Sequence, residues 1–507
     1  MNLFSLLEGA ARRWPHAGAV FSGTQCLQSW TQLHDRALRL AGALGAQPGR
    51  IAIASENAPQ YLELMFGAWA AGAAVAPLNY KLHPREMADI ACDAEPSRLF
   101  ASAALAPGLR EALPPDWRER VVTIGSAQYE ALFRADPAKP CETSPETLAW
   151  LFYTSGTTGK SKGAMLTHRN LMAMTVSHLA DVEAIDEGCS LIHAAPMSHG
   201  SGLYIPAYVA RGARQVVPAS GSFEPEVFLD LCEAHPACGA FLAPTMVQRL
   251  RIAAETAGRA RPRGLRSIVY GGGPMYVEEL NKSLAVFGQV FAQIYGQGES
   301  PMTITWLRRA DHACGDAAVL GSVGTARTGM EIRVVCEDGR DLSPGETGEI
   351  LCRGETVMAG YWRNHEGTAE ALRDGWLRTG DMGSMDDRGY LTLRDRSKDV
   401  VISGGSNIYP REVEEALLTH PAVAEVCVVG VPDAEWGEVA LAFVVTAAGV
   451  AVTERDLDAH CLARIARFKR PKRYLWIEAL PKNSYGKVLK RTLRETLIDS
   501  KTERTMP

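Results

Sequence analysis

The sequence lacks the cysteine spacing that marks zinc sites and disulfide frameworks. None of its eleven cysteines forms a Cys-x-x-Cys pair, and the closest two, Cys232 and Cys238, have five residues between them. Scattered, unpatterned cysteines are typical of reduced thiols, so they favour a cytoplasmic protein over a secreted one.

The chain also lacks a strong charge of either sign and any low-complexity segment. Its formal net charge is -5 and its isoelectric point is near 6.2, which gives no global attraction to nucleic acid or to an anionic membrane. We therefore expect small molecules bound at local sites and no nucleic-acid partner. The oligomeric state is left open, with a homodimer among the alternatives.

Long hydrophobic runs are missing as well. The most apolar window, residues 64–80, is free of charge for seventeen residues but contains Gly67, Gly72 and Pro77. A membrane span needs about 20 apolar residues, so the window predicts a buried helix followed by a strand and no integral membrane association. Near the N-terminus Glu8 interrupts a short apolar stretch and basic residues follow it, the reverse of a secretory signal.

The 507 residues predict three or more structural units. Helical patterns alternate with strand-like runs at residues 50–54, 149–154 and 267–270, which favours layered α/β subdomains with largely parallel sheets. From Glu331 short strands and Gly- or Asp-rich turns predict a small antiparallel, barrel-like subdomain. After Arg396 a small α+β unit is expected, with helices at 410–419 and 454–466 and strands at 423–431 and 441–446.

The strongest local signal is TSGTTGKSKG at residues 154–163, directly after an apolar strand. Glycines allow backbone N–H groups to surround an anion, hydroxyls donate hydrogen bonds to it, and lysines supply positive charge. A Walker A loop would need glycine where Thr154 stands, so the segment is a different polyphosphate loop. The alternative, a flexible Ser/Gly surface loop, explains neither the preceding strand nor the lysines.

This segment resembles the phosphate loop of the adenylate-forming superfamily, which contains acyl-CoA synthetases, luciferases and peptide-synthetase adenylation domains. Further motifs follow in that family's order along nearly the whole chain. The resemblance implies a large N-terminal AMP-binding domain (1–395), a hinge (396–399) and a small mobile C-terminal domain (400–507), with ATP, Mg²⁺ and CoA as cofactor and co-substrates. It also implies ATP contacts from the loop residues Thr154, Ser155, Gly156, Thr157, Thr158, Gly159, Lys160 and Lys162.

Two further motifs resemble the adenosine-binding segments. YGGGP at 270–274 is similar to the adenine turn, which implies contacts from Gly272 and Gly273. YGQGES at 295–300 and the later GWLRTGD at 375–381 imply nucleotide contacts from Tyr295, Gly296, Gln297 and the ribose carboxylate Asp381, with Glu299 holding magnesium. The family generally has threonine where this chain has Gly298, so the expected hydroxyl is missing.

The long segment from Asp395 to Glu414 resembles the interdomain crossover. By this resemblance Arg396 contacts the nucleotide, Lys398 is the pivot, and Gly404 and Gly405 border the approach of the thiol. The final motif, PKNSYGK at 481–487, implies that Lys487 is the catalytic cation that bridges the acid and the α-phosphate.

The acceptor is expected to be CoA. Residues 464–473 carry six basic side chains and no acidic one. They resemble the CoA-contacting segment of acyl- and aryl-CoA ligases, which implies roles for Phe468 and Arg470, while Trp436 is similar to a tryptophan beside the pantetheine arm. Two alternatives stay open: an adenylation enzyme that loads a carrier protein, and a nucleotide-binding module without catalysis.

The acid pocket is the least determined part. His199, in a Ser/Gly-rich loop, is a candidate to position the carboxylate. Candidate pocket walls are apolar or weakly polar, which suits a fatty or aromatic acid and disfavours a dicarboxylate; they are Leu203, Tyr204, Ala243, Met246 and Met302.

Overall fold

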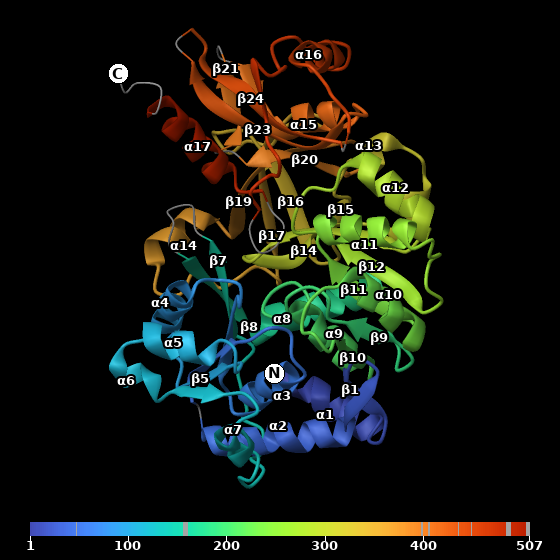
Figure 1. Cartoon of the computed structure of the whole chain (residues 1–507). Coiled ribbons are helices and arrows are strands. Elements are labelled where there is room, and N and C mark those ends of the chain that lie inside the picture. Colours follow the sequence, from blue (N-terminus) through green and yellow to red (C-terminus); the bar gives the residue numbers. More distant parts are fainter. Residues whose placement is uncertain are drawn as a thin grey trace.

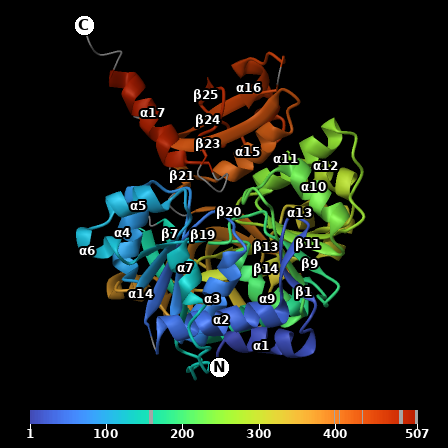
Figure 2. The same ribbon diagram turned by 60° about the horizontal axis from the view of Figure 1, so that its bottom comes forward.

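The computed structural model describes residues 1–46, 48–155, 161–396, 399–403, 406–433, 435–447, 449–482 and 488–502. Figure 1 shows the elements after β20 as a small unit stacked on a much larger N-terminal part. Figure 2, turned by 60°, shows the same separation, with α15, β23 and β24 on one side of the larger part. This arrangement confirms the predicted α/β fold with a large N-terminal and a small C-terminal domain.

The first sheet of the large part has six strands in the order β6-β5-β3-β4-β7-β8. All neighbours run parallel except β7 and β8, which form an antiparallel hairpin. The strands are β3 (Arg50–Ala54), β4 (Ala74–Leu78), β5 (Arg98–Ala101), β6 (Val121–Thr123), β7 (Leu148–Ser155) and β8 (Ser161–Thr167). The helices in this stretch of sequence are α2 (Trp30–Leu44), α3 (Gln60–Ala70), α4 (Pro84–Ala94), α5 (Ala106–Ala112), α6 (Pro115–Arg118) and α7 (Ala127–Leu132).

The apolar window at residues 64–80 forms the predicted helix and strand. Nearly every residue of α3 is buried, and β4 follows after a turn at Gly72, whose φ of +78° suits glycine. Burial on all sides explains why this helix has no polar face. In the described part of the chain, no helix is long and apolar enough to cross a bilayer.

The second sheet has nine strands in the order β15-β14-β13-β12-β11-β9-β10-β1-β2. Its centre is parallel and its edges are antiparallel. The strands are β1 (Gly18–Ser22), β2 (Gln25–Ser29), β9 (Ser190–Ile192), β10 (Arg214–Val217), β11 (Cys238–Leu242), β12 (Leu265–Tyr270), β13 (Phe291–Gln297), β14 (Ser300–Leu307) and β15 (Thr325–Ala326). The helices are α1 (Phe4–Arg13), α8 (His168–Ser177), η1 (His178–Val182), η2 (Gly202–Tyr204), α9 (Ile205–Ala210), α10 (Pro225–Ala234), α11 (Pro244–Thr256), α12 (Val277–Phe287), η3 (Arg309–Ala313) and α13 (Ala317–Leu320).

The third sheet is antiparallel, as predicted from Glu331 onward. It contains β16 (Met330–Val335), β17 (Gly348–Gly354), β18 (Leu372–Arg373), β19 (Trp376–Met385) and β20 (Leu391–Arg396), with α14 (His365–Ala371) before β18. Strand β19 pairs with β17 on one side and with β20 on the other, so residues near Asp381 lie inside the sheet.

The C-terminal unit has its own five-stranded sheet. Its strands are β21 (Val401–Ser403), β22 (Ser406–Ile408), β23 (Val423–Asp433), β24 (Gly437–Thr446) and β25 (Arg473–Trp476), and its helices are α15 (Pro410–Leu418), α16 (Glu454–Leu462) and α17 (Lys490–Thr502). Helix α16 ends four residues before the predicted bound. The unit contacts the large part through Tyr276, whose hydroxyl donates to Glu414 Oε2 over 3.0 Å, and through Lys490, 3.3 Å from Asp395.

Three buried histidines make stability depend on pH. Burial lowers the pKa of His168 and His193 to about 4 and that of His178 to about 3. The unfolded chain takes up protons near pH 6.5 while the folded chain does not, so their destabilising effect is absent above that pH and grows as pH falls toward 4.

We expect the free energy of unfolding in urea to fall by roughly 1 to 2 kcal/mol per buried histidine between pH 7 and pH 5. His193→Gln should reduce this pH slope, whereas His365→Gln, at an exposed position that begins α14, should leave it unchanged. Equal slopes in wild type and His193→Gln would contradict the prediction.

Candidate active site

The phosphate-loop segment closes the β7–β8 hairpin of the first sheet. Thr154 stands opposite Lys162, and the backbone of Ser155 pairs with that of Ser161. The intervening predicted residues Gly156, Thr157, Thr158, Gly159 and Lys160 lie outside the described residues. The hairpin therefore places the two ends of the predicted loop, Thr154 and Lys162, side by side.

Glu299 lies between β13 and β14 and faces this hairpin. Its Oε1 accepts hydrogen bonds from the Tyr361 hydroxyl, 2.6 Å away, and from Thr154 Oγ1, 3.4 Å away. Lys162 Nζ lies 5.1 Å from the centroid of the Tyr361 ring. The structure thus gathers the predicted metal carboxylate and two predicted phosphate contacts around Tyr361, a residue for which no role was predicted.

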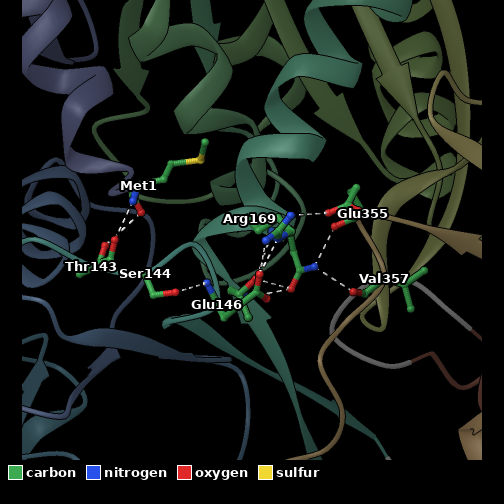
Figure 3. A network of polar contacts seen from close by, with 9 residues as sticks. Met1, Thr143, Ser144, Glu146, Arg169, Glu355 and Val357 are labelled. Carbon is green, nitrogen blue, oxygen red and sulfur yellow. Dashed lines mark hydrogen bonds and ion pairs between the residues drawn. The ribbon is translucent and has the colours of Figure 1, made fainter. Parts of the chain in front are cut away.

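Figure 3 shows a polar network around Arg169 that holds Glu355 and Val357, a few residues before Tyr361 in the sequence. Arg169, at the start of α8, donates to Glu146 over 2.6 Å and lies 3.4 Å from Glu355. Asn170 Nδ2 donates to the backbone oxygens of Glu355 and Val357 over 2.8 and 2.9 Å. One residue further on, the backbone N–H of Met358 donates to the carbonyl of Glu299, so the Tyr361 segment is tied to Glu299 by its main chain as well.

Asp381 lies where the second and third sheets meet. Its Oδ2 accepts from the Tyr295 hydroxyl over 2.7 Å and from Gln297 Nε2 over 2.6 Å, and Gln297 also donates to the carbonyl of Thr379. Burial, followed by the charge of Asp381, raises the pKa of Tyr295 well above its usual value. Tyr295 therefore stays a neutral donor, and three residues predicted to hold the nucleoside share one hydrogen-bonded cluster.

The glycine-rich turn after β12 leaves room for a flat ligand. Gly272 has a φ of +79°, a conformation that favours glycine, and a Cβ on Gly273 would meet only Pro244, at 3.8 Å. Gly296 is needed for a different reason, because its Cβ would lie 2.5 Å from the backbone nitrogen of Met302. Close packing of β13 against the Met302 backbone therefore excludes any side chain at position 296.

The predicted acid-pocket residues lie in adjoining parts of the core. Tyr204, Met246 and Met302 belong to one hydrophobic cluster together with Phe241, whose ring stacks on Tyr204 at 5.8 Å. Leu203 contributes to the neighbouring core, which Met302 also contacts. Ala243 caps α11 beside Pro244, on the side of the adenine turn. Phe241 was missed from the sequence because a phenylalanine within a buried strand carries no functional signal.

His199 is a neutral side chain at neutral pH. Burial lowers its pKa to about 4, and its Nδ1 lies 3.0 Å from Ser198 Oγ. Its ring meets Phe152 edge-on, with centroids 4.8 Å apart. A neutral imidazole positions a carboxylate through a hydrogen bond rather than through charge.

The missing threonine at position 298 has a structural explanation. A Cβ added to Gly298 would lie 2.7 Å from Phe152 Cδ1 and would also meet the methyl group of Thr154. Thr154 and Phe152 together therefore occupy the space that a larger residue at position 298 would need.

Gly298→Thr is expected to destabilise the fold by about 1 to 3 kcal/mol through overpacking and to weaken ATP binding, because Thr154 must move. Phe152→Leu/Gly298→Thr should recover part of the lost stability but not the ATP affinity, because the contact with Thr154 remains. Urea denaturation and calorimetric titration with ATP measure both effects. A Gly298→Thr variant as stable as wild type would show that the two side chains do not compete for this space.

In the C-terminal region several predicted residues lie outside the described part of the chain. These are Lys398, Gly404, Gly405 and Lys487. Arg396 ends β20, where its backbone pairs with Asp381. The predicted nucleotide contact Arg396 thus stands next to the ribose candidate by strand register alone.

The predicted CoA residues differ in exposure. Trp436 and Phe468 are exposed aromatic side chains, with 44% and 48% of their surface accessible. Arg470 instead pairs with Asp458 at 2.7 Å and is mostly covered. The exposed cations of this basic segment are Arg464, Arg467, Lys472 and Arg473.

The chemistry around Glu299 fits a magnesium ion that is held mainly by its nucleotide. Mg²⁺ is commonly bound by one or two carboxylates together with phosphate oxygens. Among the described residues there is no group of three or more His, Cys, Asp or Glu able to form a closed metal site. Glu299, with the Thr154 hydroxyl beside it, matches the open type of site.

Comparison with known proteins gives concordant results. A family model described as AMP-binding enzyme matches residues 7–362, and one described as AMP-binding enzyme C-terminal domain matches residues 412–487. The fatty acid–[acyl-carrier-protein] ligase ScoC of Streptomyces coeruleorubidus is 35% identical over 96% of this chain and 94% of its own length. A feruloyl-CoA synthase of Amycolatopsis is 36% identical over 96% of each chain.

The solved structures agree with the sequence relatives. ATP-bound MatB from Rhodopseudomonas palustris superposes with a TM-score of 0.88 at 30% identity, covering 98% of this chain and 99% of that one. The fold and the two matched models define an AMP-binding enzyme. The chain belongs to the adenylate-forming superfamily, in the family of the acyl-CoA synthetases.

Proposed function

We propose that this chain is an AMP-forming acid:CoA ligase that acts on a fatty or aromatic carboxylic acid. The observation that carries the proposal is the convergence of the predicted nucleotide residues. Tyr295, Gln297 and Asp381 form one hydrogen-bonded cluster, and Thr154 and Glu299 form another, although they come from three different sheets.

In the first half-reaction a carboxylate oxygen of the acid attacks the α-phosphorus of ATP, and the bond from the α-phosphorus to the bridging oxygen of pyrophosphate breaks. The Tyr295–Asp381 pair orients the nucleoside, and Lys162 and the hydroxyl of Thr154 hold phosphate oxygens. Bound at Glu299, magnesium would neutralise charge on the departing phosphates. Lys487 would bridge the two anions as they approach and stabilise the charge that develops.

In the second half-reaction a thiol attacks the acyl carbon and AMP leaves. We divide the chain at residues 396–399 and propose that the small domain turns there about Lys398 between the two steps. The turn would withdraw Lys487 and bring Gly404 and Gly405 to the acyl group. The contact between Tyr276 and Glu414 belongs to one of these two arrangements and must break in the other.

CoA is the acceptor that this chain's surface supports. Trp436 and Phe468 offer exposed aromatic faces to the pantetheine and nucleotide parts, and Lys472 Nζ lies 5.8 Å from the Trp436 ring. The exposed arginines of residues 464–473 suit the CoA phosphates better than Arg470, which is already paired with Asp458.

The same thiol chemistry would serve a carrier protein, whose pantetheine arm ends in an identical group. The relatives bear both kinds of name, CoA synthases and ligases and an acyl-carrier-protein ligase. The absence of paired cysteines among the eleven, all of which are free thiols, supports a cytoplasmic location, where both acceptors are found.

The test is acid-dependent pyrophosphate release with ATP and Mg²⁺, over fatty, aromatic and amino acids, with CoA, with a pantetheinylated carrier protein, and with neither. The proposal predicts pyrophosphate release with fatty or aromatic acids. It also predicts that kcat/KM for thioester formation is at least about 100 times higher with CoA than with the carrier protein, which is within the range by which enzymes discriminate between related substrates. Thioester on the carrier protein alone would assign the other acceptor. ATP binding with no release for any acid would support a module without catalysis.

A further inference from the structure

The predicted acid pocket borders a small, mainly apolar cavity that has several polar residues in its lining. Three predicted pocket walls, Leu203, Tyr204 and Met302, line it, and His178, Thr303 and Arg327 close it. Its volume, about 10 Å³, accommodates about one water-sized group. The polar residues come from η1, β14 and the turn after β15, segments that are far apart in the sequence, so their meeting could not be predicted.

Several polar atoms around this cavity have no hydrogen-bond partner within the described part of the chain. They are Nη2 of Arg327, the hydroxyl of Tyr204 and both ring nitrogens of His178. Arg327 and His178 are only 3% exposed and Tyr204 is 6% exposed, so the protein shields these atoms from solvent. Buried polar groups in folded proteins are nearly always satisfied, and such a gathering of unsatisfied ones therefore indicates a ligand.

The cavity wall carries no net charge. Arg327 Nε donates to Asp181 Oδ2 over 2.9 Å, and the backbone N–H and the hydroxyl of Thr328 also donate to Asp181. Burial, followed by the charge of Arg327, lowers the pKa of His178 to about 3, so its imidazole is neutral. A second carboxylate would add an unpaired buried negative charge here, which is unfavourable, whereas a neutral oxygen would not.

The backbone of the pocket wall is held to the same cluster. Met302 has a φ of +61°, which is uncommon for a residue with a side chain, and its carbonyl accepts from Arg327 Nη1 over 3.2 Å. The ring of Tyr204 lies between His178, whose ring meets it edge-on at 4.8 Å, and Phe241, which stacks on it at 5.8 Å. Arg327 thus holds the backbone of Met302, which forms one wall of the pocket, and also supplies a polar group at the end of the pocket.

We propose that His178, Tyr204 and Arg327 form the distal recognition site of the acid pocket, and that it selects acids with a neutral oxygen substituent at the end remote from the reacting carboxyl group. The substituent is a hydroxyl, ether or keto group whose oxygen accepts from Arg327 Nη2. This inference rests on the proposed function, because it specifies the acid that the same site activates.

The test compares kcat/KM for pyrophosphate release within matched acid pairs. The pairs are para-hydroxycinnamate against cinnamate and ω-hydroxyoctanoate against octanoate. A third comparison uses para-carboxycinnamate, which carries a charged substituent. Wild type should prefer the hydroxylated member of at least one pair by about 10- to 100-fold, the range expected when buried polar groups are satisfied or left unpaired, and should discriminate against the dicarboxylate.

Two variants alter the site. Tyr204→Phe deletes only the hydroxyl, and Arg327→Lys keeps a cation beside Asp181 but replaces the guanidinium, so that Nη2 and the Nη1 bond to the Met302 carbonyl are both lost. Each should lower the preference ratio by about 3- to 10-fold or more. Tyr208→Phe is the matched control: its hydroxyl is equally buried in α9 but donates to Glu183 over 2.6 Å, so its loss should not change the ratio.

The outcomes separate this inference from the proposed function. Two outcomes would overturn only the distal site. One is pyrophosphate release with unsubstituted acids and no preference for oxygenated ones. The other is that the variants lower kcat/KM for both members of a pair by the same factor. A crystal structure with a water retained in the cavity beside bound acid would do the same. No release with any acid, despite ATP binding, would overturn the proposed function, and the distal site with it.

Discussion

Lys487→Ala is expected to lower the rate of acid-dependent pyrophosphate release by about 10²- to 10³-fold, the usual effect of removing a group that stabilises charge developing in a transition state. The resemblance places this lysine between two anions in the first half-reaction only. Thioester formation from CoA and separately supplied acyl-adenylate should therefore keep most of its rate.

Lys482→Ala provides the matched control for this experiment. Lys482 stands five residues earlier and pairs with Glu425 in the C-terminal unit, away from the proposed chemistry. Stopped-flow pyrophosphate release and thioester formation from the adenylate measure the two halves. Equal losses in both halves for Lys487→Ala would show that the lysine supports the fold rather than the adenylation step.

Asp381→Asn is expected to raise KM for ATP by about 10- to 100-fold while changing KM for the acid much less. A hydrogen bond to a charged group contributes about 1.5 to 3 kcal/mol, which corresponds to this factor. The amide also presents a donor to a site where Tyr295 and Gln297 both donate, so the cluster itself loses a partner.

Deoxygenated nucleotides test the assigned partner of Asp381. Wild type should discriminate against ATP analogues that lack a ribose hydroxyl, and Asp381→Asn should lose most of that discrimination. Asp386→Asn, at an exposed carboxylate that bonds its own turn after the same strand, should behave as wild type. Unchanged discrimination in Asp381→Asn would assign the carboxylate a purely structural role.

The sequence was most informative where a strand ends in a glycine- or hydroxyl-rich turn. The strands before the phosphate loop and the adenine turn, and the buried helix α3 with β4, follow from apolar runs and turn residues, whose signals are local. The same locality explains why Glu299 and Asp381 could be named: each stands in a short motif with a recognisable order of residues.

Contacts between distant segments could not be predicted in this way. Arg327 and Asp181 are 146 residues apart, and nothing in the turn that follows β15 indicates a buried guanidinium. Tyr361 was assigned no role because an aromatic residue gives no sign that its hydroxyl will reach a carboxylate 62 residues away in the sequence. The same holds for Gly298, since the side chains that leave no room for a larger residue there, Thr154 and Phe152, come from β7 of a different sheet.

The most direct test of the proposed adenylation mechanism follows the carboxylate oxygen of the acid into the nucleotide product. The enzyme is incubated with ATP, Mg²⁺, CoA and an active acid labelled with oxygen-18 in its carboxyl group, and the nucleotide product is analysed by mass spectrometry. Attack of the carboxylate on the α-phosphorus predicts AMP that carries one labelled oxygen, together with acyl-CoA. Unlabelled AMP, or ADP with labelled inorganic phosphate, would contradict the formation of an acyl-adenylate.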